Sequence, residues 1–376
     1  VGALGTLDVH FSWLEKIAIA SYSLTTYAWK MLLPIGLTNF YPYPMKVNDA
    51  LPAIYFLYVL LVSGVFFAVF KWGRNTRWLV LGVSFFVLNL LLLLQIIPVG
   101  GAVMSDRYTY LPYLGLFLIV GQCVHLMLEK RPAVGKAMFA GVLVACGGYA
   151  WATSERNKDW YDSVSLWSSA IERNPESPIA YFYLGQEYYT RFESAITPAE
   201  RKELGDSAFK YFKLSIEHKP DYTNPIICLG EYYRSTGRVD EAKASYQQAL
   251  SIDDDLESAY LGLGVVFAMK GQFDSSGTMF RKALQIKDFN PEGHSNYANY
   301  LEITGKTDSA LSEYGKSLSQ NPDAFIPYMN RGKIYVRLRK WDLALADYAK
   351  GIALKPENPY PYLQRAKCYM EMGDTS

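Results

Sequence analysis

The chain has 376 residues, of which 50% are hydrophobic and 19% are charged, and its formal net charge is +1. This length exceeds that of one ordinary domain, and neither half of the chain is basic enough for a nucleic-acid-binding protein. The four cysteines form no CxxC pair and no Cys/His metal spacing, so we expect free thiols, without a disulfide framework or a metal site.

The first apolar stretch covers residues 13–37 and contains three charged residues, Glu15, Lys16 and Lys30. It is long enough to span a membrane, because the two lysines lie near its ends and can reach the headgroups. It is equally compatible with a helix that lies along the membrane surface. The sequence leaves these two alternatives open.

Four clearer membrane spans follow in the first part of the chain. They are predicted at residues 51–70, 78–97, 108–128 and 134–151. Soluble helices rarely stay apolar for so long, because one of their faces meets water. We therefore expect residues 1–152 to be the C-terminal part of a polytopic membrane domain.

Basic residues cluster in two of the short links between these spans: Lys71, Arg74, Arg77, Lys130, Arg131 and Lys136. By the positive-inside rule both links face the cytoplasm. The link 98–107 and all residues after Ala152 would then lie on the outer face. This predicts an integral membrane protein whose C-terminal part is periplasmic or, as the alternative, in the lumen of the endoplasmic reticulum. The chain has no Asn-x-Ser/Thr sequon, which favours a bacterial inner membrane.

The C-terminal half repeats itself with a period of 34, and small residues occur at equivalent places: Gly230, Gly264, Ala298, Gly332 and Ala366. Aromatic residues follow sixteen positions later at Tyr246, Phe280, Tyr314 and Tyr348. This is the pattern of the tetratricopeptide repeat, a pair of helices that stacks on its neighbours. The predicted repeats are 178–222, 223–256, 257–290, 291–324, 325–358 and a partial one at 359–376. The fold class is therefore all-α: a transmembrane helix bundle followed by an α-solenoid.

The first repeat is eleven residues too long, because Gly185 and Ala208 are twenty-three positions apart where the other repeats have twelve. The insertion is charged and contains Pro198, so we expect a solvated loop or a one-turn helix. Residues 153–177 resemble only the second helix of a repeat, and we expect them to cap the array and dock it on the membrane domain.

The concave groove of such an array usually binds a protein or a peptide. Its predicted polar lining is Asn224, Glu231, Arg234, Glu292, Asn299, Glu302 and Lys333. This lining is mixed in charge, so the sequence does not specify the ligand.

The outer link contains an Asp106–Arg107 pair, followed by Tyr108 at the start of a predicted span. Arg107 has the geometry to bind a phosphate through two hydrogen bonds, and Asp106 suits the start of a helix. The alternative is purely structural, with Asp106 as a cap and Arg107 reaching the headgroups. No GxxxxGK[ST] or GxGxxG motif occurs, so we expect no nucleotide cofactor.

The string DRYTYLPYLGLFL, followed by one hairpin, by ERNKDWYDSVSLWSSAIERNPESPIAYFYLG and by the repeats described above, resembles the transmembrane and tetratricopeptide-repeat O-mannosyltransferases and their bacterial relatives. These belong to the C-type glycosyltransferases, integral membrane enzymes that use polyprenyl-phosphate sugars. The resemblance implies transfer of a sugar from a polyprenyl-phosphate donor to a protein hydroxyl on the outer face. The repeats would bind the acceptor or a partner protein.

In that family the catalytic acidic residue lies in the first outer loop, which would be upstream of Val1, so the chain is expected to be a fragment without it. Asp106, Arg107 and Tyr108 are then the residues expected to face the active site, with Arg107 on the donor phosphate. Two alternatives stay open. One is a non-catalytic membrane-anchored repeat scaffold, and the other is an envelope polysaccharide polymerase or ligase.

Overall fold

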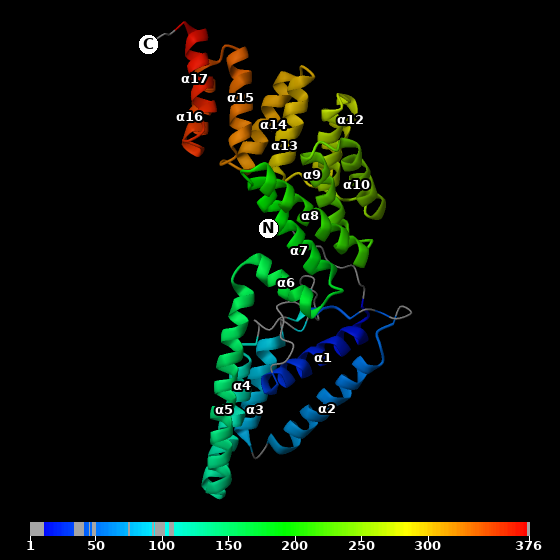
Figure 1. Cartoon of the computed structure of the whole chain (residues 1–376), viewed down its shortest axis with the longest axis vertical. Helices are drawn as coiled ribbons and strands as arrows, with labels where there is room; N and C mark the ends of the chain where they lie inside the picture. The colour runs from blue at the N-terminus through cyan, green and yellow to red at the C-terminus, as the bar shows by residue number, and fades with distance from the viewer. Residues whose placement is uncertain are drawn as a thin grey trace. The chain divides into compact units, whose positions relative to one another are not determined.

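The computed structural model describes residues 11–33, 41–44, 46, 50–73, 76–91, 94, 102–104 and 109–373. Within them the chain is all-α, as predicted, apart from two strands of two and three residues. It divides into two compact units, residues 1–187 and 188–376, with the boundary inside one helix. Figure 1 labels most of the helices of both units.

The elements of the first unit are α1 (Trp13–Leu32), β1 (Tyr41–Pro42), α2 (Ile54–Gly73), α3 (Arg77–Leu90), β2 (Ala102–Met104), α4 (Tyr113–Lys130), α5 (Pro132–Arg156), the 3-10 helix η3 (Asn157–Trp160), α6 (Ser163–Arg173) and the first part of α7 (Pro178–Ser194).

Among the described residues, three helices are long and apolar enough to cross a membrane: Ile54–Gly73, Tyr113–Lys130 and Pro132–Trp160. Their apolar side chains are largely exposed, as expected for helices that lipid covers. The predicted span 78–97 corresponds to α3, whose described helix ends at Leu90. Residues 92–93 and 95–100 lie outside the described part, so this span stays a prediction.

The hydrophobic core of the first unit lies where α1 meets the start of α2, the end of α3 and the start of α4. Ile19 and Tyr27 of α1 are buried there with Phe86 and Leu90 of α3. The two strands pair antiparallel beside this core, with Tyr41 opposite Met104. Small residues such as Ala18 on the packed face of α1 let the neighbouring helices approach closely.

The predicted capping segment forms η3 and α6, and α6 packs on the first part of α7 in the same unit. The Trp167 ring of α6 stacks on the Tyr183 ring of α7, with centroids 4.6 Å apart. Asp162 begins α6, because its carboxylate accepts the backbone N–H of Ser165 at 2.7 Å. The Arg173 guanidinium of α6 lies 2.6 Å from the Asp159 carboxylate of η3, and this ion pair links the two elements.

The elements of the second unit are the end of α7 and the helices α8 (Pro198–His218), α9 (Thr223–Ser235), α10 (Val239–Ile252), α11 (Glu257–Met269), α12 (Phe273–Ile286), α13 (Pro291–Ile303), α14 (Thr307–Gln320), α15 (Phe325–Arg337), α16 (Trp341–Leu354) and α17 (Pro359–Met372).

The helix pairs of this unit pack through the small and aromatic residues of the repeat pattern. A Cβ atom at Gly230 would lie 2.6 Å from the buried ring of Tyr246, and one at Gly264 would lie 2.5 Å from Phe280. Both distances are shorter than any real contact, so only glycine lets the two helices of these repeats approach so closely. The large aromatic side chain on the second helix fills the space that the missing Cβ leaves.

The turn between the two helices of a repeat needs a left-handed backbone. Gly237, Gly271 and Gly305, which occupy the same place in three successive repeats, have φ angles of 78°, 70° and 78°. Arg339 occupies the next equivalent position with φ of 55°. This conformation is costly for a residue with a Cβ, so Arg339 is a strained site in an otherwise regular array.

The predicted loop or one-turn helix in the first repeat is wrong. α7 continues to Ser194 and α8 already begins at Pro198, so the insertion lengthens both helices instead of the turn between them. The reason is a strong helix start. Thr197 accepts the backbone N–H of Glu200 at 3.2 Å, and Pro198 is at the first helical position.

Candidate functional site

The residues predicted to face the donor, Asp106, Arg107 and Tyr108, lie outside the described part of the chain. The structure does describe the rest of their sequence string, from Thr109 onward. Thr109 is buried and Tyr110 is 79% exposed, while Pro112 directly precedes α4. The string therefore continues into the first two turns of a candidate membrane helix.

Tyr113 fixes this first turn to two other helices. Its hydroxyl donates to the backbone carbonyl of Tyr27 in α1 at 2.8 Å. Its ring stacks on Phe86 of α3, with centroids 6.5 Å apart. The string thus has a structural role at Tyr113, which its resemblance to an active-site motif did not indicate.

Gly115 brings α4 into backbone contact with α3. A Cβ atom at Gly115 would lie 2.3 Å from the carbonyl oxygen of Gly82, and one at Gly82 would lie 2.6 Å from that of Gly115. Each glycine therefore needs the other, and no larger residue fits at either position. This contact therefore fixes the first turn of α4 against α3.

A second polar cluster at this end of the unit surrounds Glu15, which the sequence showed only as an interruption of an apolar stretch. Its Oε2 atom accepts from the backbone N–H of Ser12 at 2.8 Å and from Lys46 Nζ at 3.1 Å. Its Oε1 atom accepts the backbone N–H of Leu51 at 3.1 Å. The carboxylate is fully engaged in these contacts, so it positions the chain and is not a candidate catalytic base.

The inner face of the repeat array is formed by the first helix of each repeat. α9 contacts α11, α11 contacts α13, α13 contacts α15, and α15 contacts α17. Within residues 188–373, all of which are described, no comparable contact joins successive second helices. The first helices therefore converge on the concave side, where a groove ligand would bind.

The predicted groove residues fall into two groups. Asn224, Glu231, Arg234 and Glu302 are half-buried, whereas Glu292, Asn299 and Lys333 are exposed. Glu302 lies 3.5 Å from Arg337, and the Nζ atom of Lys333 lies 5.4 Å from the centre of the Tyr360 ring. The exposed group offers one carboxylate, one amide and one ammonium to a ligand.

Glu231 and Arg234 bind each other and the aromatic residue below them. Arg234 Nε donates to Glu231 Oε2 at 2.9 Å, and the Tyr246 hydroxyl donates to Glu231 Oε1 at 2.5 Å. Burial alone would lower the pKa of Arg234, but the adjoining Glu231 carboxylate outweighs it and raises that pKa. Burial and the same carboxylate raise the pKa of Tyr246, so its hydroxyl keeps its proton and remains a donor.

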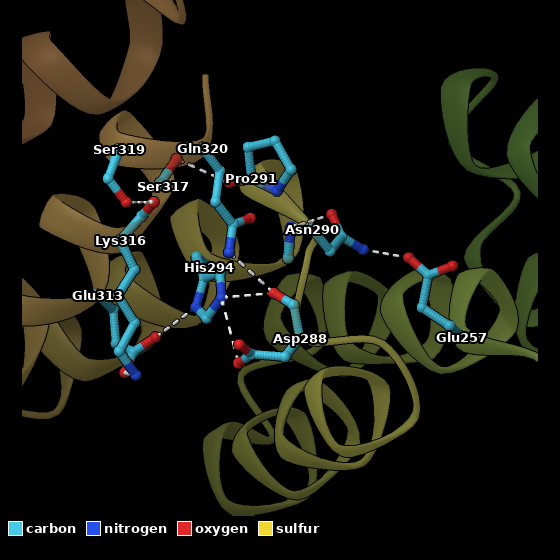
Figure 2. A network of polar contacts seen from close by, with 11 residues as sticks. Glu257, Asp288, Asn290, Pro291, His294, Glu313, Lys316, Ser317, Ser319 and Gln320 are labelled. Carbon is cyan, nitrogen blue, oxygen red and sulfur yellow. Dashed lines mark hydrogen bonds and ion pairs between the residues drawn. The ribbon is translucent and has the colours of Figure 1, made fainter. Parts of the chain in front are cut away.

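A polar network between α11, α13 and α14, which Figure 2 shows, had no counterpart in the sequence patterns. Its centre is His294, which is 1% exposed. The Nδ1 atom lies 2.6 Å from Glu313 Oε2, and Nε2 lies 2.8 Å from the carbonyl oxygen of Asp288. Asn290 connects this group to Glu257 of the preceding repeat. A lone histidine in a helical repeat carries no sequence signal of such a network.

The described residues contain no group of three or more His, Cys, Asp or Glu side chains that could hold a metal ion. Their cysteines are free. Burial raises the pKa of the Cys228 thiol to about 12, so it stays protonated and unreactive at neutral pH. Cys228 is therefore not a candidate nucleophile.

Comparison with known proteins supports the two parts of the chain separately. Models of the TPR repeat and of the tetratricopeptide repeat match residues 230–271 and 298–359. The crystal structure of the APC/C hetero-tetramer Cut9–Hcn1 is similar in fold, with a TM-score of 0.51 and 13% identity. The similarity covers 76% of this chain and 53% of that one. The C-terminal half therefore carries tetratricopeptide repeats.

Two curated relatives are protein O-mannosyl-transferases. TMTC3 of Mus musculus is 24% identical over 155 residues, which is 41% of this chain and 15% of the relative. Tmtc3 of Drosophila melanogaster is 25% identical over 203 residues, which is 52% of this chain and 20% of the relative. The chain thus spans a fifth or less of these proteins. Together with the three apolar helices, this distant similarity indicates a glycosyltransferase-like membrane protein.

Proposed function

We propose that the chain belongs to a membrane enzyme that transfers a sugar from a polyprenyl-phosphate donor to a protein hydroxyl on the periplasmic or luminal face. The observation that carries the proposal is one chain joining apolar helices to tetratricopeptide repeats, with distant similarity to protein O-mannosyl-transferases over 52% of its length. In this reaction the acceptor oxygen bonds to C1 of the sugar, the bond from C1 to the phosphate oxygen breaks, and the acceptor proton passes to a base.

In this proposal Arg107 binds the donor phosphate, with Asp106 and Tyr108 beside it. A guanidinium suits a phosphate better than an ammonium does, because its planar donors form two parallel hydrogen bonds. The packing of Tyr113 and Gly115 supports the assignment, since it fixes the helix that starts five residues after Tyr108. A phosphate site next to a candidate span also suits a donor whose lipid part stays in the bilayer.

The proposed role of the repeats is to bind the protein acceptor or a partner along the inner face. Glu292, Asn299 and Lys333 support this role, because these predicted groove residues lie on first helices of the repeats and their side chains are exposed. Half-buried groups such as Glu231 and Arg234 would contribute shape more than new contacts, since they already satisfy each other.

The test is transfer of radiolabelled mannose from polyprenyl-phosphate mannose to protein by the whole enzyme in membranes. Alkaline β-elimination of the product identifies a hydroxyl linkage. We expect Arg107→Ala to abolish transfer, while Arg131→Ala, an exposed arginine after α4, leaves it unchanged. Full activity of Arg107→Ala would contradict the donor-phosphate role.

Two other results would contradict the proposal and indicate a different function. Label recovered in a polysaccharide would indicate an envelope polymerase or ligase. No transfer from the intact protein, with a protein partner retained on the repeats, would indicate a scaffold. The side of the membrane is tested by labelling Glu292→Cys in intact cells with an impermeant maleimide, which should react if the repeats lie outside.

A further inference from the structure

α1 is packed along its middle, and the exposed side chains at its two ends are apolar. Ala18, Ile19 and Tyr27 are buried in the core of the first unit, and Leu24 packs against it. At the two ends of the helix, Trp13, Leu14, Ile17 and Leu32 are 68%, 71%, 46% and 58% exposed. Exposed apolar side chains at both ends of a helix, on a unit with candidate membrane helices, are suited to contact with lipid.

The N-terminal part of α1 contacts the segment before α2 and the beginning of α2. The Glu15 carboxylate accepts the backbone N–H of Leu51, three residues before α2, and lies 3.1 Å from Lys46 Nζ. The Tyr22 ring lies 5.0 Å from Tyr55 and 5.2 Å from Tyr58, both in the first two turns of α2.

The C-terminal part of α1 is held by two tyrosine hydroxyls from α4 and α5. Tyr113, the first residue of α4, donates to the carbonyl of Tyr27 at 2.8 Å. Tyr149 of α5 donates to the carbonyl of Met31 at 2.5 Å.

These two tyrosines lie at the same level of the helix pair. α4 and α5 run antiparallel, because Gly135 of α5 meets the backbone of Leu128 of α4. Tyr113 and Tyr149 are each about 25 Å along their helices from the tight turn at Arg131, at about 1.5 Å per residue. Their hydroxyls therefore mark one end of the pair.

The start of α2 is at the same end as the start of α4. α3 runs antiparallel to α4, since Phe86 packs on Tyr113 and Gly82 on Gly115. α2 ends beside the start of α3, where Gly73 meets Val80, and the link between them is short. Such a link turns the chain back, so α2 begins where α3 ends and α4 starts.

We infer that α1 does not cross the membrane but lies along its surface at this end of the helices, with Trp13, Leu14, Ile17 and Leu32 in the lipid. A helix of this length that spanned would place its two ends about 28 Å apart, on opposite faces. Instead its beginning, at Glu15, and its end, at Met31, both contact one end of the helix bundle.

The charges and aromatic residues of α1 also suit an interfacial helix. Lys16 lies over the Trp13 ring at 5.1 Å, and Lys30 lies over the Tyr41 ring at 5.0 Å. Tryptophan rings at the headgroup level, with lysines that reach toward the phosphates, are typical of helices lying in the interface. This orientation does not depend on the proposed transferase activity.

Spin-label depth in bilayers separates the two orientations. The whole protein, with its native cysteines replaced by serine, carries one label at Leu14, Thr25 or Leu32. These three positions share one side of α1, away from Leu24 in the core, and are about 16 Å and about 10 Å apart along its axis. For a helix in the interface, collision with oxygen and with a water-soluble nickel complex should give the same depth at all three, about 5–10 Å below the headgroups.

The matched control uses α2 at the same spacing, with labels at the exposed positions Ile54, Val65 and Trp72. There the central label should be about 10 Å deeper than the outer two, as for a spanning helix. The same rise and fall at Thr25, a steady gradient from Leu14 to Leu32, or three labels fully in water would each overturn the inference.

Discussion

Glu15 and Lys46 join two segments that are far apart in the chain, with 3.1 Å between Glu15 Oε2 and Lys46 Nζ. The same carboxylate completes a capping box with Ser12 at the start of α1 and holds the backbone of Leu51. One side chain thus determines where α1 begins and where the segment leading to α2 returns.

We expect Glu15→Gln to destabilise the first unit by about 1–3 kcal/mol, because the amide cannot accept from all these donors and one of its own atoms is a donor. Thermal unfolding in detergent should detect the lower midpoint. Glu129→Gln is the control, since Glu129 is 60% exposed and lies 3.3 Å from the equally exposed His125. Equal midpoints for the two variants would contradict this role of Glu15.

Gly115→Ala should cost about 1–3 kcal/mol, because its Cβ would overlap the Gly82 carbonyl and force α3 and α4 apart. Gly121→Ala in the same helix meets nothing within 4 Å and should leave the midpoint unchanged or slightly raised. The measurement is again thermal unfolding in detergent. A tolerated Gly115→Ala would show that the two helices are not in backbone contact.

In the repeats, Gly262→Ala should weaken the packing of α11 on α10 by about 1–3 kcal/mol, because the new Cβ would lie 2.3 Å from the buried Tyr246 ring. Gly315→Ala in α14 meets no neighbour and should stabilise its helix by about 0.5–1 kcal/mol. Amide hydrogen exchange of the helices concerned measures both changes in the whole protein. The prediction fails if both variants shift exchange in the same direction.

Arg339→Gly should stabilise the turn between α15 and α16 by about 1 kcal/mol, because arginine has a steric cost at φ of 55° that glycine avoids. Slower amide exchange at the start of α16 is the expected result. Gly305→Ala, at the equivalent turn one repeat earlier, should have the opposite effect. Faster exchange in Arg339→Gly would mean that the side chain has a stabilising contact that outweighs the strain.

His294→Phe should cost about 1–3 kcal/mol, because it removes both hydrogen bonds of a buried imidazole and leaves the Glu313 carboxylate without one of its partners. Exchange should rise in α13 and α14, where the network lies, and much less in α16. Glu292→Gln, an exposed change on the same helix, serves as the control. If His294→Phe raises amide exchange no more than Glu292→Gln does, His294 does not stabilise the packing of the repeats.

The sequence alone determined the fold class and the repeat register. Both depend on periodicity: residues such as Gly230 and Tyr246 have counterparts at the same place in the following repeats, because each repeat must pack on the next in the same way. Long apolar runs likewise identify helices that lipid covers. The same counting predicts Glu292, Asn299 and Lys333 on the groove side, since position in the repeat determines the face of the helix, and their side chains are exposed in the structure.

The tertiary structure determined the contacts that follow no period in the sequence. Glu15, His294 and the Gly82–Gly115 pair obtain their roles from partners that no sequence spacing connects. Whether α1 crosses the membrane or lies along it is a question of the same kind, because the length and apolar character of the helix fit both. Only its contacts with Leu51, Tyr113 and Tyr149 favour one orientation.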